Sequence, residues 1–324
     1  MRNRFHYLRR VFSSYLFTKT NPLSFWHGEP EVNSRAVYDR IGPYYMRFDY
    51  KADYKGLMDN RGVPMLHYHG RIGPQYNPIA VAQYGLAHYN RWISEDQPAS
   101  RDIFLRQAEW LTDTLSPNDH GMPVWRHHFD FDYFQTLKSG WYSGLAQGQG
   151  LSMLLRAHRV TGKRRYRKAA DDVFMTMKTG IGDGGVLYQD AEGFLWIEEY
   201  LVDPPTHILN GFIWALWGVY DYWLYTNDAG AKTLFDACIR TISSSLHRYD
   251  TGYWSLYELS PLPLKMMASP FYHRLHIVQL DILYRMTGLP VFQKTANRWA
   301  LYSQKKWNRT RSLAEKAIFK LIYY

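Results

Sequence analysis

An internal repeat constrains this sequence more than any other feature. Predicted helix starts recur about every 65 residues, near Pro78, Tyr142, Thr206 and Tyr272. Each of the four units opens with an apolar helix rich in small residues and continues with a more amphipathic one. The apolar helices are expected at 79–89, 145–159, 208–224 and 276–286, and the amphipathic helices at 102–114, 163–178, 231–247 and 290–305.

This alternation predicts a fold class. A helix that is apolar on all sides must be surrounded by other helices, whereas an amphipathic helix can cover it from outside. We therefore expect a mainly α protein: an incomplete α/α toroid of about four helix pairs, an (α/α)4 barrel, spanning the catalytic domain 77–324. Residues 1–76 are expected to hold a basic helix and a β-hairpin region, in which β-like runs at 44–50 and 63–69 flank a turn at 59–62.

Charge and aromatic content bear on the partner. The formal net charge is +10, which favours a polyanion, and the sequence contains 12 Trp and 27 Tyr. Packing a helical core accounts for part of these aromatic residues. The remainder suits stacking on sugar rings, so the predicted partner is an acidic polysaccharide and not a nucleic acid.

Targeting signals and cysteines bear on the compartment. Cys238 is the single cysteine, so no disulfide within the chain is expected. The basic N-terminus lacks the pattern of a signal peptide, and no uncharged apolar run is long enough to span a bilayer. These features predict a cytoplasmic protein. Residues 1–17 are either a peripheral contact with an anionic inner membrane or an ordinary packing helix.

Polar residues recur near the starts of the apolar helices. Buried amides and imidazoles must find hydrogen-bond partners, so these residues either bond between helices or form a shared polar floor beneath a cleft. Polar residues occur at matching depth in all four apolar helices, which favours the shared floor. The residues are Gln83, Gln147, Gln149, Asn210, His276 and Gln279.

A second candidate feature lies between residues 194 and 222. A β-like aromatic run ends in Glu198-Glu199-Tyr200, Pro204-Pro205 breaks the chain, and an apolar helix is expected from Thr206. The acid pair thus lies where a strand gives way to a helix, which suggests a site. The alternative is a solvated loop.

Several of these motifs resemble one family. Segments 73–89, 140–150 and 198–212, followed by Tyr257 and the segment 272–280, are similar in order and spacing to the C-terminal half of the D-glucuronyl carbon-5 epimerases. Those enzymes convert D-glucuronate to L-iduronate within heparan-type chains. The resemblance covers residues 70–300 and implies the same activity on a heparosan-like substrate.

The resemblance also implies site residues. Epimerisation removes the proton on carbon 5 and returns one to the opposite face, so it needs a base, an acid and a group that stabilises the enediolate. Tyr200, Tyr257 and Tyr272 are the implied proton-transfer set, on three loops, with Tyr200 and Tyr272 on opposite faces. Glu199 is expected to hold a sugar hydroxyl, accept the proton or orient Tyr200. The implied substrate-binding residues are Tyr76, Gln83, Trp141, Gln147, Gln149, Asn210 and His276.

This chain departs from the family in two places. Ser260 stands where the family has an arginine, so Lys265 or Arg274 would have to supply the positive charge for the substrate carboxylate. The N-terminal region that carries a calcium site in the relatives is short here. We therefore expect no metal and no cofactor; the spacing of the histidines also lacks metal-ligand motifs.

Two other functions fit the same features. A polysaccharide lyase would abstract the same proton on the same fold and then eliminate the carbon-4 substituent. A non-catalytic polysaccharide-binding module would keep the aromatic and basic residues without proton transfer. A homodimer is a further expectation about assembly.

Overall fold

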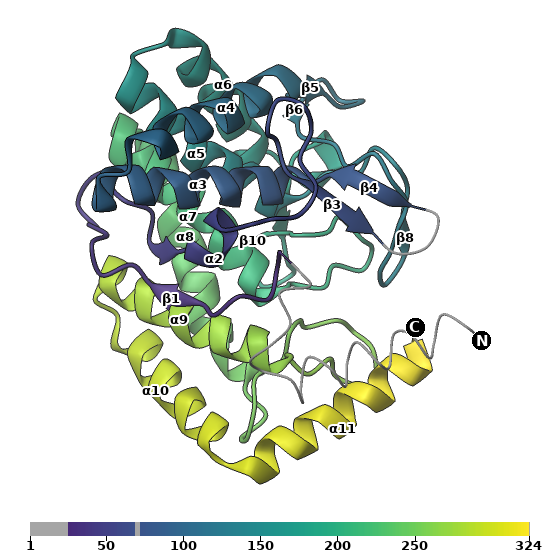
Figure 1. Ribbon diagram of the computed structural model, residues 1–324. Helices are drawn as coiled ribbons and strands as arrows, with labels where there is room; N and C mark the ends of the chain where they lie inside the picture. Colours follow the sequence, from purple (N-terminus) through teal and green to yellow (C-terminus); the bar gives the residue numbers. More distant parts are fainter. Residues whose placement is uncertain (1–24, 69–71, 324) are drawn as a thin grey trace. The chain divides into compact units, whose positions relative to one another are not determined.

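The computed structural model describes residues 25–68 and 72–323 (Figure 1). The basic helix expected within residues 1–17 lies outside the described residues. The described chain forms two compact units. The larger unit comprises residues 33–205 and 211–241, and the smaller unit comprises residues 25–32, 206–210 and 242–323.

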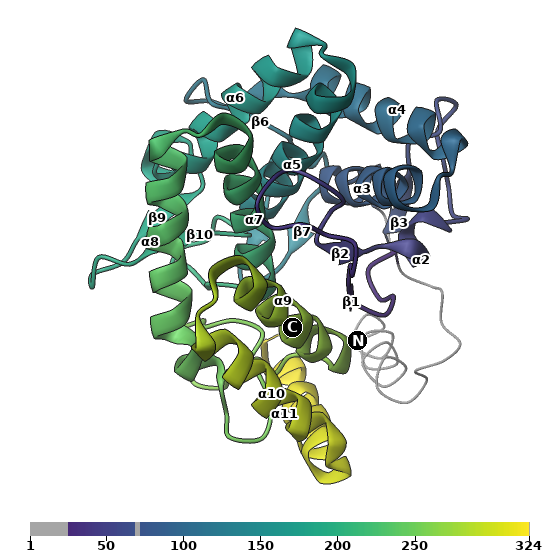
Figure 2. The ribbon, with the colours of Figure 1, turned by 90° about the vertical axis from the view of Figure 1, so that its left-hand side faces the viewer.

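The larger unit is built from helix pairs. Its helices are α3 (Pro78–Glu95), α4 (Pro98–Thr114), α5 (Gly144–Thr161) and α6 (Arg164–Lys178), with α7 (Leu209–Thr226) from Gly211 and α8 (Ala229–Ser245) up to Thr241. In Figure 2, α5 lies between α3 and α7. These three helices form an inner layer whose N-terminal three turns are buried, and the more exposed α4, α6 and α8 cover it.

Small residues allow the inner helices to approach closely. A Cβ atom at Gly148 of α5 would overlap with the backbone of Ala215 in α7, and one at Gly218 would overlap with the backbone of Gly148. Any side chain at either glycine would therefore force the two helices apart. This explains why the apolar repeat helices are rich in small residues.

A buried ion pair also joins α5 to α7. Arg156 and Asp221 are both fully buried, and their closest N–O distance is 2.5 Å. Tyr45 donates a hydrogen bond to Asp221 at 2.7 Å, and Arg156 donates to the carbonyl of Gly42 at 3.0 Å. Burial alone would lower the pKa of Arg156, but the charge and hydrogen bonds of Asp221 raise it above its ordinary value.

The smaller unit is also helical. It contains α9 (Pro270–Thr287), α10 (Pro290–Gln304) and α11 (Lys306–Tyr323), preceded by the short helix η2 (Leu246–Tyr249) and the strand β1 (Glu31–Val32). Helix α9 packs against α10 and β1, and α10 packs against α11. Figures 1 and 2 both show α11 as a separate helix beyond α10.

Short antiparallel strand pairs occupy the connections between the helices of the larger unit. Each pair joins neighbouring strands in the sequence. The pairs are β3 (Met65–Tyr68) with β4 (Gly73–Tyr76), β5 (Ser116–Pro117) with β6 (Pro123–Val124), β7 (Phe131–Asp132) with β8 (Thr136–Leu137), and β9 (Leu187–Gln189) with β10 (Leu195–Ile197). The larger unit also contains β2 (Met46–Arg47), the four-residue helix α2 (Asp49–Ala52) and the short helix η1 (Ile181–Asp183).

An N-terminal hairpin forms, but the predicted pairing of its strands is wrong. Residues 49–52 form α2, and the strand at 65–68 pairs with β4 instead of the run at 44–50. The turn at 59–62 does form, with the N–H of Gly62 donating to the carbonyl of Asp59 at 3.0 Å, but only Met58 and Pro64 bridge across it. β3 pairs with β4, the next strand in the chain, in place of the expected run at 44–50. The domain boundary at 76/77 stays a prediction.

Every predicted repeat helix exists, with shifted ends. Helix α7 begins at Leu209 and not at Thr206. The reason is a pair of long-range backbone bonds: the Thr206 carbonyl accepts a hydrogen bond from the N–H of Leu259, and the Leu209 N–H donates to the carbonyl of Tyr257 at 3.2 Å. The backbone of 206–209 is therefore bonded to another segment of the smaller unit. Helix α11 was not predicted.

Neutralising Asp221 should destabilise the fold strongly. Asp221→Asn leaves the Arg156 cation buried without its anion, which typically costs about 3–5 kcal/mol. Urea unfolding should show this loss, whereas Asp172→Asn, which breaks an exposed pair with Lys168 on α6, should cost less than about 1 kcal/mol. Equal losses in the two variants would show that the buried pair has no special role.

Candidate active site

The strand β10 delivers the acid pair. It ends at Ile197, and the N–H of Glu198 donates to the carbonyl of Val186 at 3.0 Å. The carbonyl of Glu198 in turn accepts from the N–H of Gly144, the first residue of α5, at 3.0 Å. Glu198 and Glu199 are 1% and 5% exposed. The solvated-loop alternative is therefore wrong for both carboxylates.

Glu199 lies against the first turn of α7. A Cβ atom at Gly211 would overlap with the Glu199 carboxylate, so the glycine makes room for it. The positive end of a helix dipole favours negative charge at such a position. The sequence thus places a buried carboxylate at a helix start, one residue before Tyr200.

Tyr200 belongs to an aromatic cluster. Its ring centroid lies 4.7 Å from Tyr133, 5.5 Å from Phe131 and 5.7 Å from Trp141. Tyr200, Tyr133, Phe131 and Trp141 are all half-buried. Flat rings with polar edges suit stacking on sugar rings. The cluster joins Tyr200 to the predicted substrate-binding residue Trp141.

His127 packs against Trp141, one member of this cluster. Its ring stacks on Trp141 with centroids 3.7 Å apart, and the Trp141 indole N–H donates to the carbonyl of Phe129 at 2.9 Å. Burial lowers the pKa of His127 to about 3, so the imidazole is neutral at physiological pH. No site role for His127 was predicted from the sequence.

The second pair of predicted catalytic residues lies in the smaller unit. The rings of Tyr257 and Tyr272 are 4.8 Å apart at an angle of 64°. The backbone of Tyr257 is held on both sides, since its N–H donates to Met266 at 2.8 Å and its carbonyl accepts from Leu209. Tyr272 lies in the first turn of α9, where Ser269 caps the helix. Its predicted location on a loop is wrong, because the cap extends the helix back to Pro270.

In the same unit, two histidines are within hydrogen-bond distance of one hydroxyl group. The Ser255 hydroxyl lies 2.8 Å from Nδ1 of His273 and 3.0 Å from Nδ1 of His276. His273 also contacts the carbonyl of Trp299 at 3.0 Å. Burial, the His273 ring and Lys316 keep the pKa of His276 well below its usual range. His276 is therefore a neutral ring bonded within the unit.

The two candidate replacements for the missing arginine have other partners. Lys265 donates to its own loop, at 3.4 Å from the carbonyl of Ser260 and 3.2 Å from that of Leu262. Arg274 is exposed and forms an ion pair with Glu29. Both side chains would have to leave these contacts to bind a substrate carboxylate.

The inner-helix amides are buried as expected. Gln83, Gln147 and Gln149 are fully buried in the larger unit, and their amides meet no hydrogen-bond partner among the described residues. Gln149 does lie close enough to the Tyr44 hydroxyl to influence its pKa, which burial raises. In the smaller unit, Gln279 donates to the Asn210 carbonyl at 2.9 Å. Unpaired buried amides are suited to small polar ligands such as water or sugar hydroxyls.

Tyr76 has a structural contact. Its hydroxyl donates to Asp59 at 2.9 Å, and its ring packs 5.4 Å from that of Trp110. The bond ties β4 to the turn that precedes β3. Its predicted role in substrate binding stays a prediction.

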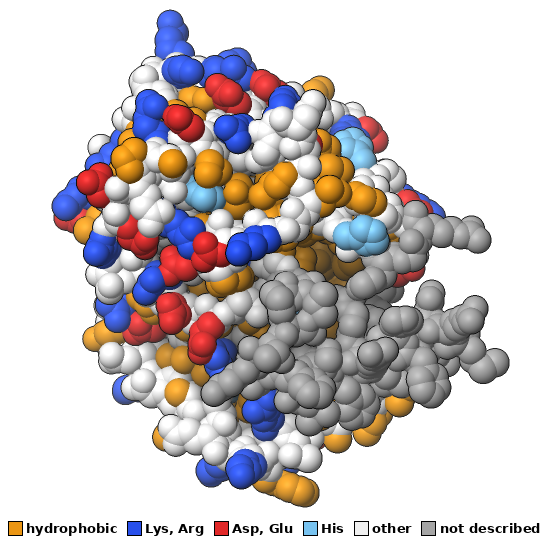
Figure 3. Space-filling model, viewed as in Figure 1, with side chains coloured by type: hydrophobic (Ala, Val, Ile, Leu, Met, Phe, Trp, Pro, Cys, Tyr) orange, Lys and Arg blue, Asp and Glu red, His pale blue; other side chains and the backbone are white. Residues whose placement is uncertain are grey.

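Charge, metal and membrane features complete the description. On the face shown in Figure 3, Lys and Arg side chains are interspersed with Asp and Glu and form no single basic patch. Among the described residues, no group of three or more His, Cys, Asp or Glu could hold a metal ion. Within residues 25–68 and 72–323, no helix is both long and apolar enough to cross a membrane.

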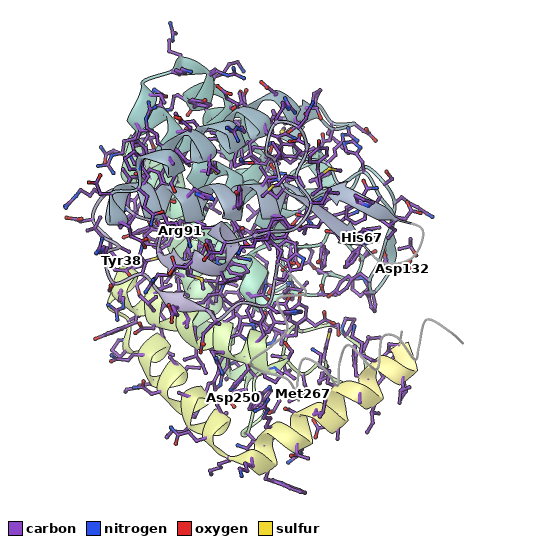
Figure 4. All side chains as sticks on the ribbon, in the orientation of Figure 1. Tyr38, His67, Arg91, Asp132, Asp250 and Met267 are labelled. Atoms are coloured by element: carbon purple, nitrogen blue, oxygen red, sulfur yellow. The ribbon has the colours of Figure 1, made fainter. Side chains whose placement is uncertain are left out.

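The buried His127 should make stability depend on pH. Below pH 6.5 the unfolded chain binds a proton at residue 127 that the folded protein excludes until about pH 3, so the free energy of unfolding falls by up to about 1.4 kcal/mol per pH unit. His127→Phe keeps a stacking ring and should reduce the slope between pH 6.5 and 5 by this amount in urea titrations. His67→Phe, at an exposed position in β3 (labelled in Figure 4), controls for loss of an imidazole. An unaltered slope in His127→Phe would contradict the expectation.

Three comparisons with known proteins bear on this site. The chain is 32% identical over 232 residues to a D-glucuronyl C5-epimerase of Caenorhabditis elegans, a match that covers 66% of this chain and 37% of that protein. It is 27% identical over 263 residues to an uncharacterized protein of Methanocaldococcus jannaschii, covering 75% and 83%. The chain thus spans little more than a third of the animal relative.

A solved structure confirms the fold class. The cellobiose 2-epimerase of Spirochaeta thermophila superposes with a TM-score of 0.50 at 13% identity, over 70% of this chain and 58% of that one. At this identity the likeness concerns the fold alone. The predicted mainly helical α/α toroid is confirmed.

The family comparison covers the region that holds the site. The model of the D-glucuronyl C5-epimerase C-terminus matches residues 118–301, which include Trp141, Glu199, Tyr200, Tyr257 and Tyr272. This match extends over more than half of the chain. The chain therefore belongs to the D-glucuronyl C5-epimerase C-terminal family.

Proposed function

We propose that this protein is an epimerase that inverts carbon 5 of D-glucuronate to L-iduronate within a heparosan- or heparan-type polysaccharide. The observation that carries the proposal is the Tyr257–Tyr272 pair, two phenols whose rings lie 4.8 Å apart inside the family's matched region. A phenol can donate a proton, and its phenolate can accept one from a carbon of the sugar ring.

The proposed reaction conserves all atoms and charges. One tyrosinate takes the proton from carbon 5, the carbon–hydrogen bond breaks, and its electron pair passes into the adjacent carboxylate as an enediolate. A second tyrosine then donates its phenolic proton to the opposite face of carbon 5 and becomes the tyrosinate. We assign these two roles to Tyr200 and Tyr272. Tyr257 donates to the substrate carboxylate or bridges the pair.

The larger unit supplies groups that fit substrate binding. Trp141, fixed by its stack on His127 and its bond to Phe129, presents a rigid aromatic surface next to Tyr200. Glu199 is buried beside Tyr200 and is placed to accept a hydroxyl hydrogen bond or to orient the phenol. The polar floor expected from Gln83, Gln147 and Gln149 is part of the same proposal.

Other expectations remain sequence-based predictions. They are a cytoplasmic location, contact of residues 1–17 with an anionic membrane, a homodimer, and a reaction that needs no metal or cofactor. The choice of an unsulfated heparosan backbone as substrate also belongs here.

The role of Glu199 can be tested by an isosteric change. Glu199→Gln should lower turnover by about 100-fold, because a group that acts near the transition state loses its charge or its proton. Far-ultraviolet circular dichroism should show an intact fold. The matched control is Glu192→Gln, an exposed carboxylate in the loop between β9 and β10. Full activity in Glu199→Gln would remove Glu199 from the mechanism.

The two-face assignment makes a sharper prediction. Tyr200→Phe and Tyr272→Phe each delete one phenolic proton and keep the ring, so epimerisation should fall by about 100-fold or more in both. Exchange of the carbon-5 hydrogen with solvent needs only the base for that epimer. One variant should therefore exchange deuterium into glucuronate residues alone, and the other into iduronate residues alone, as measured by mass spectrometry.

Three outcomes would change the proposal. Equal loss of exchange from both epimers in both variants would contradict the two-face assignment and point to one shared base. An unsaturated uronate product would identify a lyase. Binding of heparosan with no exchange in the wild-type protein would identify a non-catalytic binding module.

A further inference from the structure

Two buried lysines on α11 are not explained by packing. Lys316 and Lys320, one turn apart, are 7% and 5% exposed, and Glu258 beside Tyr257 in the chain is 2% exposed. An ammonium group is costly to bury unless charges or hydrogen bonds compensate it. Burying an apolar residue at position 316 would cost less free energy than burying a cation, so a function for the cation is worth considering.

Lys316 is fixed at the segment that holds Tyr257. Its ammonium donates to the carbonyl of Met267 at 2.8 Å and lies 5.9 Å from the centroid of the Tyr257 ring. Met267, labelled in Figure 4, bridges Leu256, and the neighbouring Met266 accepts the N–H of Tyr257. The Lys316 ammonium is thus bonded to the backbone bridge next to Tyr257.

The charges around Lys316 favour a modest loss of basicity. Burial lowers the pKa of Lys316 to about 8, against the opposing effect of Glu258. Burial and then the charge of Lys316 lower the pKa of Lys320 well below its usual range. His276, which also senses Lys316, is neutral. Lys316 therefore keeps most of its charge near neutral pH.

The other cations near this region are committed elsewhere. Lys265 is exposed and bonded to carbonyls of its own loop, and Arg274 is exposed and paired with Glu29. Lys265 and Arg274 are held by these partners, whereas the Lys316 ammonium lies over the ring of Tyr257. The field of a buried cation is also screened far less than that of an exposed one.

We infer that Lys316 is a positioning residue of the proposed epimerase, whose fixed ammonium stabilises the phenolate form of Tyr257. The inference rests on the proposed function for its catalytic meaning. A nearby cation favours the charged form of an acid, so forming the phenolate of Tyr257 costs less free energy while Lys316 is charged than without it. Lys316 acts through Tyr257 and need not contact the substrate.

The test uses the pH dependence of the rate. Lys316 is charged below about pH 8, so the ratio of wild-type kcat to Lys316→Met kcat should be about tenfold at pH 7 and should approach one above about pH 9. Lys316→Arg, which keeps a positive charge, should retain a kcat near that of the wild type at pH 7. Lys294→Met, at an exposed position of α10, is the matched control and should leave kcat unchanged at every pH.

The kinetic parameters provide a second readout. At neutral pH, the loss in Lys316→Met should fall on kcat, with KM changed less than about twofold. Thermal unfolding must show a folded variant, and Lys316→Gln replaces Lys316→Met if it does not. A structural role alone would lower the unfolding temperature and reduce kcat by the same factor at every pH.

The outcomes separate this inference from the proposed function. A wild-type protein that epimerises, with a kcat ratio to Lys316→Met that does not change with pH, would overturn the inference and leave the function standing. A wild-type protein that does not epimerise would overturn the proposed function and, with it, the catalytic role of Lys316.

Discussion

The buried ion pair between Arg156 and Asp221 is the constraint on which the larger unit depends. Both groups are fully buried, so each must be satisfied completely, and the bonds from Tyr45 and to Gly42 accomplish this. The rings of Tyr44, Tyr45 and Tyr89 lie over the guanidinium at 5.2–5.8 Å. One charge pair thereby fixes α5, α7 and the segment before α2 together.

The placement of the acid pair follows from that constraint. The start of α5 holds Glu198 through a backbone bond, and the first turn of α7 accommodates Glu199 at Gly211. Any change in the spacing of the two helices would move the residue before Tyr200. The smaller unit uses a different device, a neutral Ser255–histidine network and the backbone bonds of Tyr257, to hold its two phenols. Glu199 in the larger unit and Tyr272 in the smaller unit thus each lie at the first turn of a helix.

The repeat predicted the helices because burial imposes a period on the sequence. Small and apolar residues occur on all sides of the inner helices because these helices pack closely, as Gly148 and Ala215 do. The N-terminal strands were not predictable in the same way, because β3 pairs with the next strand in the chain, β4, and not with the earlier β-like run. The start of α7 was misplaced for a similar reason, since Thr206 bonds to Leu259, far away in the sequence.

The candidate site residues could be named from the sequence, but their electrostatic environment could not. The Glu199–Tyr200 and Tyr257–Tyr272 sets came from spacing and resemblance. The burial of Lys316 gives no local signal, because a lysine on an amphipathic helix is usually a solvated residue. Similarly, the neutral state of His127 depends on its stack with Trp141 and its burial, which a single sequence does not show.

The central claim is that the protein inverts carbon 5 of a uronate by proton transfer. The most direct measurement is the proton NMR spectrum of heparosan after incubation with the wild-type protein in deuterated water. The account predicts iduronate residues that carry deuterium at carbon 5, with no loss of chain length. Unsaturated uronate ends, or glucuronate that keeps its original carbon-5 hydrogen, would contradict it.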